Sequence, residues 1–307
     1  MAIFKNKKVV YAYLLVCFIW GSTYLAIRIG VTNFPPLLFA GTRNITAGLL
    51  MFLYVTKKGF SLPQSKKEFF KISLAGVILL TAANGAVVVA EQWVESGFIA
   101  LIIAINPVMI LLIESFILKK SKVTGAQFAS VLLGLVGVLL LLSSDSKIST
   151  IPTIGIVLSL IAPLLWSIGS IYASGTKLTA HIYSVSAIQL FAGGVGQLII
   201  AFFLKQHHNI PSINSKVILS WLYLVFFGSI IAYSAYQYII KNLPASIAAT
   251  STYVNPVVAL FLGAIFLKED ITVLTVVAAT IILASVILLG RLRNKKSKTV
   301  EGTCTEL

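Results

Sequence analysis

Ten blocks of apolar residues follow one another along the chain, separated by short stretches that hold most of the charged and turn-forming residues. Each block is near the roughly 20 residues that a helix needs to cross the hydrocarbon core of a bilayer. The pattern predicts an all-α integral membrane protein with ten transmembrane helices, at about residues 9–29, 36–56, 69–93, 96–118, 124–143, 152–174, 182–204, 217–240, 245–267 and 271–290.

The composition agrees with a membrane location. Hydrophobic residues make up 58% of the chain and charged residues 11%, whereas soluble proteins carry roughly 25% charged residues. The first block, residues 9–29, is too long for the apolar part of a signal peptide and is followed by many further blocks. We therefore expect it to be the first transmembrane helix.

The Lys and Arg residues predict the orientation of these helices. With the N-terminus in the cytoplasm, 18 of the 24 lie in cytoplasmic segments, as the positive-inside rule requires. The net charge of +15 then reflects topology and not nucleic-acid binding, because no segment offers an exposed basic face with aromatic residues. We expect a multi-pass cell-membrane protein with both termini cytoplasmic, and five basic residues at the outer side, Arg28, Lys147, Lys205, Lys216 and Lys268.

The chain also contains an internal repeat. The Asn-Pro-Val sequence that begins at residue 106 recurs at residue 255, a shift of 149 residues. A shift of 146 residues aligns further pairs, Trp20 with Trp166, Arg43 with Gln189 and Gly48 with Gly194. The repeat predicts two five-helix units, residues 1–150 and 151–290, followed by a basic, disordered cytoplasmic tail at residues 291–307.

Five helices per unit is an odd number, so the second unit must enter the membrane in the opposite orientation to the first. Inverted repeats of this kind are typical of secondary transporters, which bind substrate near the midplane, where the repeats meet.

Several of these residues resemble the EamA-type branch of the drug/metabolite transporter superfamily, over residues 9–290. The stretch from Trp20 to Ile27, Pro35-Pro36-Leu37 followed by Arg43, the two Asn-Pro pairs and Leu267-Lys268-Glu269 are similar to that family's motifs. The chain departs from the family at Asn106 and Asn255, where many relatives have Glu or Ser, and at Lys119-Lys120, where an acidic residue is frequent. The resemblance implies export of amino acids and other small metabolites.

Polar and aromatic residues inside the apolar blocks are the candidates for substrate binding. Tryptophan usually lies at the membrane interfaces, so the two aligned tryptophans near mid-helix either wall a cavity or pack between helices. The residues at positions 81 and 84 are spaced to share a helical face, as are those at 233, 236 and 237; such faces line a cavity or bond to other helices. The candidates are Trp20, Tyr24, Arg43, Thr81, Asn84, Asn106, Trp166, Ser170, Tyr233, Tyr236, Gln237 and Asn255.

Arg43 is the only clearly intramembrane cation. A cation at the bilayer centre costs about 2.5–3.5 kcal/mol on insertion scales, so its side chain should face protein or water. Two roles are open. Arg43 binds a substrate carboxylate, or it pairs structurally with Glu91, Glu95 or backbone carbonyl groups.

Pro107 and Pro256 each remove one backbone hydrogen bond inside a predicted helix. We expect them to act as hinges during transport, with a static bend as the alternative. Asn106 and Asn255 either cap the freed groups or contact substrate. The fifth and tenth helices carry small residues at spacings that allow close packing, and a homodimer through these two helices is the alternative use of that surface.

The sequence therefore predicts a secondary transporter that moves a small, amino-acid-like metabolite outward by alternating access, with a small-molecule substrate and the lipid bilayer as its partners. The alternatives are a membrane-embedded lipid-modifying enzyme and a nucleotide-sugar-type carrier. An enzyme would need a nucleophile, base or metal set, and the chain has no HExxH motif, no GxSxG motif and no intramembrane Asp pair. We expect no metal and no cofactor. No acidic residue lies at the centre of a block, so the sequence offers no obvious proton carrier. It therefore does not indicate which ion is coupled to transport.

Overall fold

A computed structural model describes residues 6–119, 124–144, 151–208, 210–211 and 213–303, and these contain helices and no strands. The first half of the chain consists of α1 (Lys7–Val31), α2 (Pro36–Lys58), α3 (Lys66–Gly76), the π-helical η2 (Val77–Asn84), α4 (Gly85–Ala90), α5 (Ser96–Ile103), α6 (Asn106–Leu112), the π-helical η3 (Ile113–Ile117) and α7 (Gly125–Ser144).

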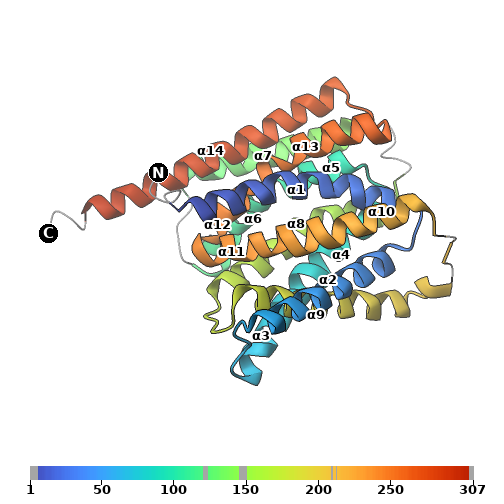
Figure 1. Cartoon of the computed structure of the whole chain (residues 1–307). Helices are drawn as coiled ribbons and strands as arrows, with labels where there is room; N and C mark the ends of the chain where they lie inside the picture. Colours follow the sequence, from blue (N-terminus) through green and yellow to red (C-terminus); the bar gives the residue numbers. More distant parts are fainter. Residues whose placement is uncertain (1–5, 120–123, 145–150, 209, 212, 304–307) are drawn as a thin grey trace.

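The second half continues the bundle, and Figure 1 shows the end of α14 at the same end of the bundle as the start of α1. It consists of α8 (Thr153–Gly175), α9 (Ile182–Phe203), the 3-10 turn η5 (Gln206–His208), α10 (Ser215–Tyr223), the π-helical η6 (Leu224–Tyr233), α11 (Ser234–Asn242), α12 (Ala245–Ala248), the 3-10 segment η7 (Ala249–Tyr253), α13 (Asn255–Leu262), the π-helical η8 (Gly263–Leu267) and α14 (Val273–Thr303).

The prediction of an all-α membrane protein is confirmed. Within the described residues, eight helices or continuous helical runs are long and apolar enough to cross a bilayer. The two remaining predicted spans coincide with α7 and α14, whose apolar parts, Gly125–Leu141 and Val273–Ser285, are shorter. The count of ten spans therefore stays a prediction.

The local structure repeats along the chain at the spacing of the sequence repeat. Lys119 and Lys268, which the shift of 149 residues aligns, both have a left-handed backbone, with φ of 51° and 56°. A non-glycine residue with positive φ is uncommon. Each follows a π-helical segment, η3 or η8, and the π-helical η2 likewise has a counterpart in η6. Duplication of one helical unit predicts this recurrence.

Helices α2 and α9 run antiparallel and form the most extensive contact between any two described elements. At one end, the backbone N–H of His181 donates to the carbonyl oxygen of Ser61 at 2.9 Å. At the other end, the backbone N–H of Leu37 donates to Gln206 Oε1 at 3.0 Å. The start of each helix thus lies beside the end of the other, as two oppositely oriented units require. Helices α7 and α14 also pack side by side (Figure 1).

Glycines allow α2 and α9 to approach at backbone distance. A Cβ atom at Gly48 would lie 2.8 Å from the backbone nitrogen of Phe191, and one at Gly194 would lie 2.8 Å from that of Ile45. Small residues at helix contacts permit such packing in membranes, where no hydrophobic effect drives helices together. The two glycines are the pair that the shift of 146 residues aligns, so the repeat places one glycine on each side of this contact.

Helix α14 continues through Arg291 to Thr303, a stretch for which we expected disorder. No proline interrupts the helix between the apolar block and residue 303. The rest of the expected tail, residues 304–307, lies outside the described residues.

The aligned lysines provide a test of topology. In a chain whose Cys17 and Cys304 are replaced by serine, Lys268→Cys should react with a membrane-impermeant maleimide on intact cells, because the charge distribution places it outside. Lys119→Cys should react only after the membrane is opened. Labelling of both cysteines from the same face would contradict two oppositely oriented units.

Candidate functional site

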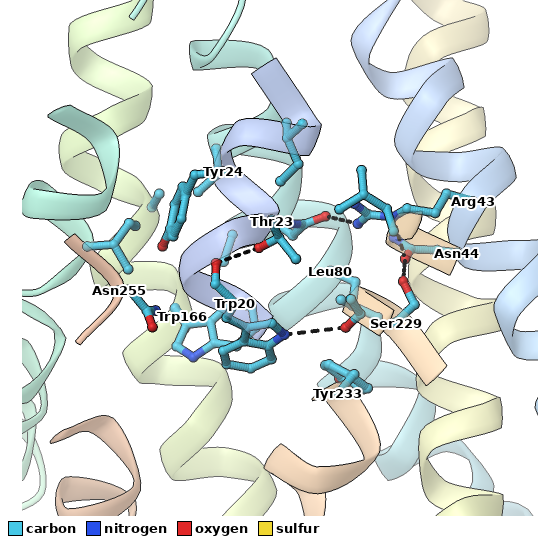
Figure 2. A pocket seen from close by; sticks show the side chains of 18 of the residues that line it. Trp20, Thr23, Tyr24, Arg43, Asn44, Leu80, Trp166, Ser229, Tyr233 and Asn255 are labelled. Carbon is cyan, nitrogen blue, oxygen red and sulfur yellow. Dashed lines mark hydrogen bonds between the residues drawn. The ribbon is translucent and has the colours of Figure 1, made fainter. Parts of the chain in front are cut away.

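A cavity of about 90 Å³ lies at the centre of the bundle, between helices of both halves of the chain (Figure 2). Its lining consists of Trp20, Thr23, Tyr24, Ile27, Arg43, Asn44, Leu80, Ala83, Asn84, Val87, Ile103, Asn106, Ala162, Trp166, Leu190, Leu224, Gly228, Ser229, Tyr233, Thr252 and Asn255.

Aromatic rings form one wall of the cavity. Trp20 on α1 and Trp166 on α8 meet edge to face, with ring centroids 5.3 Å apart. Tyr236 on α11 packs against both rings, at 4.9 and 5.5 Å. Its hydroxyl accepts a hydrogen bond from Trp166 Nε1 at 3.2 Å and lies 2.6 Å from Ser170 Oγ. The two aligned tryptophans therefore touch each other, and a hydrogen bond orients each ring, since Trp20 Nε1 donates to the carbonyl oxygen of Gly228 at 3.3 Å.

Behind this wall, mostly apolar side chains pack between the cavity and the predicted cytoplasmic end, which is the end where α1 begins. Tyr236 belongs to a buried cluster against which the two tryptophans pack. The buried members of that cluster are Val9, Ala12, Val16, Tyr236, Ile239, Ile240, Leu243 and Ala248.

Amide groups surround Arg43 on another side of the cavity. Its Nη2 donates to Asn84 Oδ1 at 2.9 Å, and its Nε donates to Asn44 Oδ1 at 3.4 Å. Gln197 joins the network, because it accepts from Asn44 Nδ2 at 2.9 Å and donates to Asn84 Oδ1 at 3.4 Å. These hydrogen-bond partners of Arg43 are neutral, so they orient the guanidinium group without neutralising it.

The two Asn-Pro sequences lie where helices are interrupted beside the cavity. Helix α5 ends at Ile103 and α6 begins at Asn106, while the 3-10 segment η7 precedes Asn255 at the start of α13. The two asparagines differ in their partners. Asn106 Oδ1 lies 3.5 Å from Ser167 Oγ, whereas Asn255 Oδ1 is buried without a hydrogen-bond partner. Asn255 thus offers the cavity a free acceptor.

The structure brings eight of the twelve predicted site residues to this cavity, from elements far apart in the sequence. Figure 2 shows Asn255 and Tyr24 on one side, Arg43 on the opposite side and the tryptophans between them. The eight are Trp20, Tyr24, Arg43, Asn84, Asn106, Trp166, Tyr233 and Asn255. Whether they bind substrate stays a prediction.

The other four predicted site residues lie outside the lining. Thr81 donates to the backbone oxygen of Gly193 at 2.8 Å and so joins α9 to η2. Ser170 and Tyr236 support Trp166 from behind. Gln237 lines a separate pocket near the ends of α8 and α11.

Four polar residues of the lining were missed by the sequence analysis. Asn44 follows the predicted Arg43, and Ser229 lies within η6 and donates to Asn44 Oδ1 at 3.3 Å. Thr23 and Thr252 complete the set. Small hydroxyl residues in apolar helices often bond to their own backbone, as Thr23 does to the carbonyl oxygen of Trp20 at 2.7 Å. Residue type therefore gave no signal that the three hydroxyl residues, Thr23, Ser229 and Thr252, face a cavity.

The cavity combines a cation, a free acceptor and aromatic faces. Among the described residues that line it, Arg43 is the one with a formal charge. Among all the residues that the structure describes, no group of three or more His, Cys, Asp or Glu side chains lies close enough together to hold a metal ion. The arrangement suits a small zwitterion, because the guanidinium group attracts a carboxylate and the acceptor and aromatic faces attract an ammonium group.

Comparison with known proteins gives one family throughout. The model of the EamA-like transporter family matches residues 7–143 and again residues 153–291. The chain is 36% identical over 273 residues to the uncharacterized inner membrane transporter YedA of Escherichia coli (strain K12), covering 88% of this chain and 86% of YedA. It is 24% identical over 279 residues to a probable amino-acid metabolite efflux pump of the same organism, covering 88% and 90% of the two chains.

A solved crystal structure shares the fold. It superimposes with a TM-score of 0.70 at 16% sequence identity, covering 95% of this chain and 99% of the other.

Proposed function

Because the chain belongs to the EamA-like transporter family and is a multi-pass membrane transporter, we propose that it exports a small, amino-acid-like metabolite by alternating access. The observation that carries the proposal is the central cavity, with a guanidinium group whose hydrogen-bond partners are neutral on one side and an amide oxygen without a hydrogen-bond partner on the other. These two groups match the carboxylate and the ammonium group of an amino acid.

Electrostatic complementarity supports a carboxylate at Arg43. Its bonds to Asn84 and Asn44 hold the guanidinium group in place before substrate arrives, so little ordering remains to be done on binding. A charge-assisted hydrogen bond in a site shielded from water contributes about 1.5–3 kcal/mol. The ammonium group would then lie near Asn255 Oδ1 and the faces of Tyr24 and Trp20.

Alternating access is supported by the way the cavity is enclosed. The tryptophan pair and the apolar cluster behind it close one route, and buried Tyr24, Ile27 and Val87 lie on the side toward the other end. The interruptions before Asn106 and Asn255 supply points at which helices can bend, which would make Pro107 and Pro256 hinges. Opening one side while the other stays closed would carry substrate across.

Export is the proposed direction, in keeping with the related protein named as a probable efflux pump. The charge of the cavity weighs against a nucleotide-sugar carrier, because the diphosphate bridge of most nucleotide sugars carries two negative charges, and Arg43 is the one charged residue among the described lining. A lipid-modifying enzyme would need a nucleophile next to a base, and the hydrogen bonds described around the cavity join amides, hydroxyls and one guanidinium group.

The test is transport by purified protein in proteoliposomes, after profiling the medium of overexpressing and deletion cells to choose an amino acid. The chosen amino acid should be compared with its amide, which lacks the carboxylate, and with its hydroxy acid, which lacks the ammonium group. We expect both analogues to be transported at least about tenfold less efficiently, because each loses one charged contact. Equal transport of all three compounds, or transport of nucleotide sugars alone, would contradict the proposal.

A further inference from the structure

Glu91 is a fully buried acidic residue whose side chain has no hydrogen-bond partner. It follows directly after α4, at the predicted outer end of the bundle, which is the end opposite the start of α1. The residue is 0% exposed, and neither Oε1 nor Oε2 has a hydrogen-bond partner. A buried ionised carboxylate without donors is costly, and the neutral acid is much less so. The enclosed side chain is therefore suited to hold a proton.

The nearby charged side chains of Arg28 and Glu269 form hydrogen bonds with groups other than the Glu91 carboxyl group. From α1, the guanidinium group of Arg28 donates to the backbone carbonyl oxygen of Glu91 and not to its carboxyl group. After η8, the carboxylate of Glu269 accepts from the backbone and hydroxyl of Ser96 at 2.9 and 2.8 Å, and from the backbone of Gly97 at 3.2 Å. Glu269 is thus satisfied where Glu91 is not.

These groups still act on Glu91 at longer range. Arg28 from α1, Arg43 from α2 and Glu269 interact with its carboxyl group electrostatically, and so does the hydroxyl of Tyr24 from α1. The two arginines favour an ionised Glu91 and Glu269 disfavours it. If water reached the carboxyl group, the cost of burial would disappear and the arginines would favour loss of the proton.

Glu91 is also connected to the cavity. Its backbone N–H donates to the carbonyl oxygen of Val87 at 2.9 Å, and Val87 lies in the cavity lining together with Tyr24 and Arg43. The residue therefore lies one helical turn from the proposed substrate site. Movements of α1 against α4 that open the cavity at this end would expose the carboxyl group.

We propose that Glu91 is a proton-binding site of the transport cycle, protonated when the outer end is closed and ionised when that end opens to water. This inference rests on the proposed function for its role in transport. On sequence alone, Glu91 was considered only as a structural partner of Arg43 and not as a proton carrier, because the residue lies near the end of a predicted span. Raising the pH should then favour the outward-open conformation.

The first experiment measures exchange of the amino acid across proteoliposomes with equal pH on both sides. Wild-type exchange should rise as the pH is raised, because Glu91 then loses its proton. Glu91→Gln mimics the protonated acid, so its rate should stay low and should not change with pH. Glu91→Asp, which restores a titratable group, should recover a rise. Glu95→Gln, four residues further along, is the matched control and should follow the wild type.

The second experiment needs no substrate, so it separates failure of this inference from failure of the proposed function. Spin labels at Asn33→Cys and Gln92→Cys, in a chain whose Cys17 and Cys304 are replaced by serine, report the distance between the ends of α1 and α4. We expect a longer-distance population that grows with pH when Glu91 is present and is lost in Glu91→Gln. A pH response that persists in Glu91→Gln, or one that is absent from the wild type, would overturn the proposal.

Discussion

Replacing Arg43 with glutamine is expected to reduce transport of the amino acid roughly ten- to a hundredfold. The substitution removes the charge that would hold the substrate carboxylate, a contact of about 1.5–3 kcal/mol, and each 1.4 kcal/mol corresponds to a factor of ten. An amide at this position retains hydrogen-bonding capacity toward Asn84 and Asn44. Much of the buried network should therefore survive, and the melting temperature of the purified variant shows whether it does.

The amide analogue of the substrate decides between the two roles that the sequence left open for Arg43. If the guanidinium group binds the carboxylate, Arg43→Gln loses activity toward the amino acid but transports the amide as well as the wild type does. If the role is structural, both compounds are transported less by the same factor. Thr81→Ser is the matched control, because Thr81 is outside the cavity lining and serine retains its hydroxyl bond to the oxygen of Gly193.

Replacing Gly194 with leucine is expected to prevent stable folding. Even the Cβ atom would lie 2.8 Å from the backbone nitrogen of Ile45 and 2.9 Å from the carbonyl oxygen of Gly41. Because these neighbours are backbone atoms of α2, they cannot move aside as a flexible side chain would. Overpacking of a buried contact lowers the free energy of unfolding by about 1–3 kcal/mol and occasionally more. Because backbone atoms are the neighbours here, we expect Gly194→Leu to lie at the upper end of that range.

Size-exclusion profiles and melting temperatures of the detergent-solubilised protein would measure the effect. The matched control is Gly125→Leu, since a Cβ atom at Gly125 has no neighbour within 4 Å. That variant should elute and melt like the wild type. A Gly194→Leu protein that melts at the wild-type temperature would show that α2 and α9 do not approach as closely as described.

The membrane class of the protein and its helical segments could be read from the sequence alone. Hydrocarbon imposes the same requirement on every span, because each backbone polar group must be bonded within its own helix. Length and hydropathy of one segment are then sufficient to identify it. The Asn-Pro repeat was also visible without a structure, because identical pairs at mid-helix are rare in apolar sequence.

The identity of the cavity residues was only partly predictable, and the π-helical segments explain why. The assumed period of 3.6 residues places Thr81 and Asn84 on one face, but both lie in η2, where each turn contains additional backbone. Asn84 lines the cavity and Thr81 faces α9 instead. In the same way, η6 ends at Tyr233, which lines the cavity, while Tyr236 on the following helix lies behind the lining.

The sequence by itself determined that the chain crosses the membrane many times, that its two halves repeat, and that Arg43 needs a polar environment. Only the tertiary structure decided that neutral Asn84 and Asn44 orient Arg43, and that Glu91 is enclosed without a partner. The physical reason is that hydropathy is a property of one segment, whereas the enclosure and pairing of a polar group depend on which other helices pack around it.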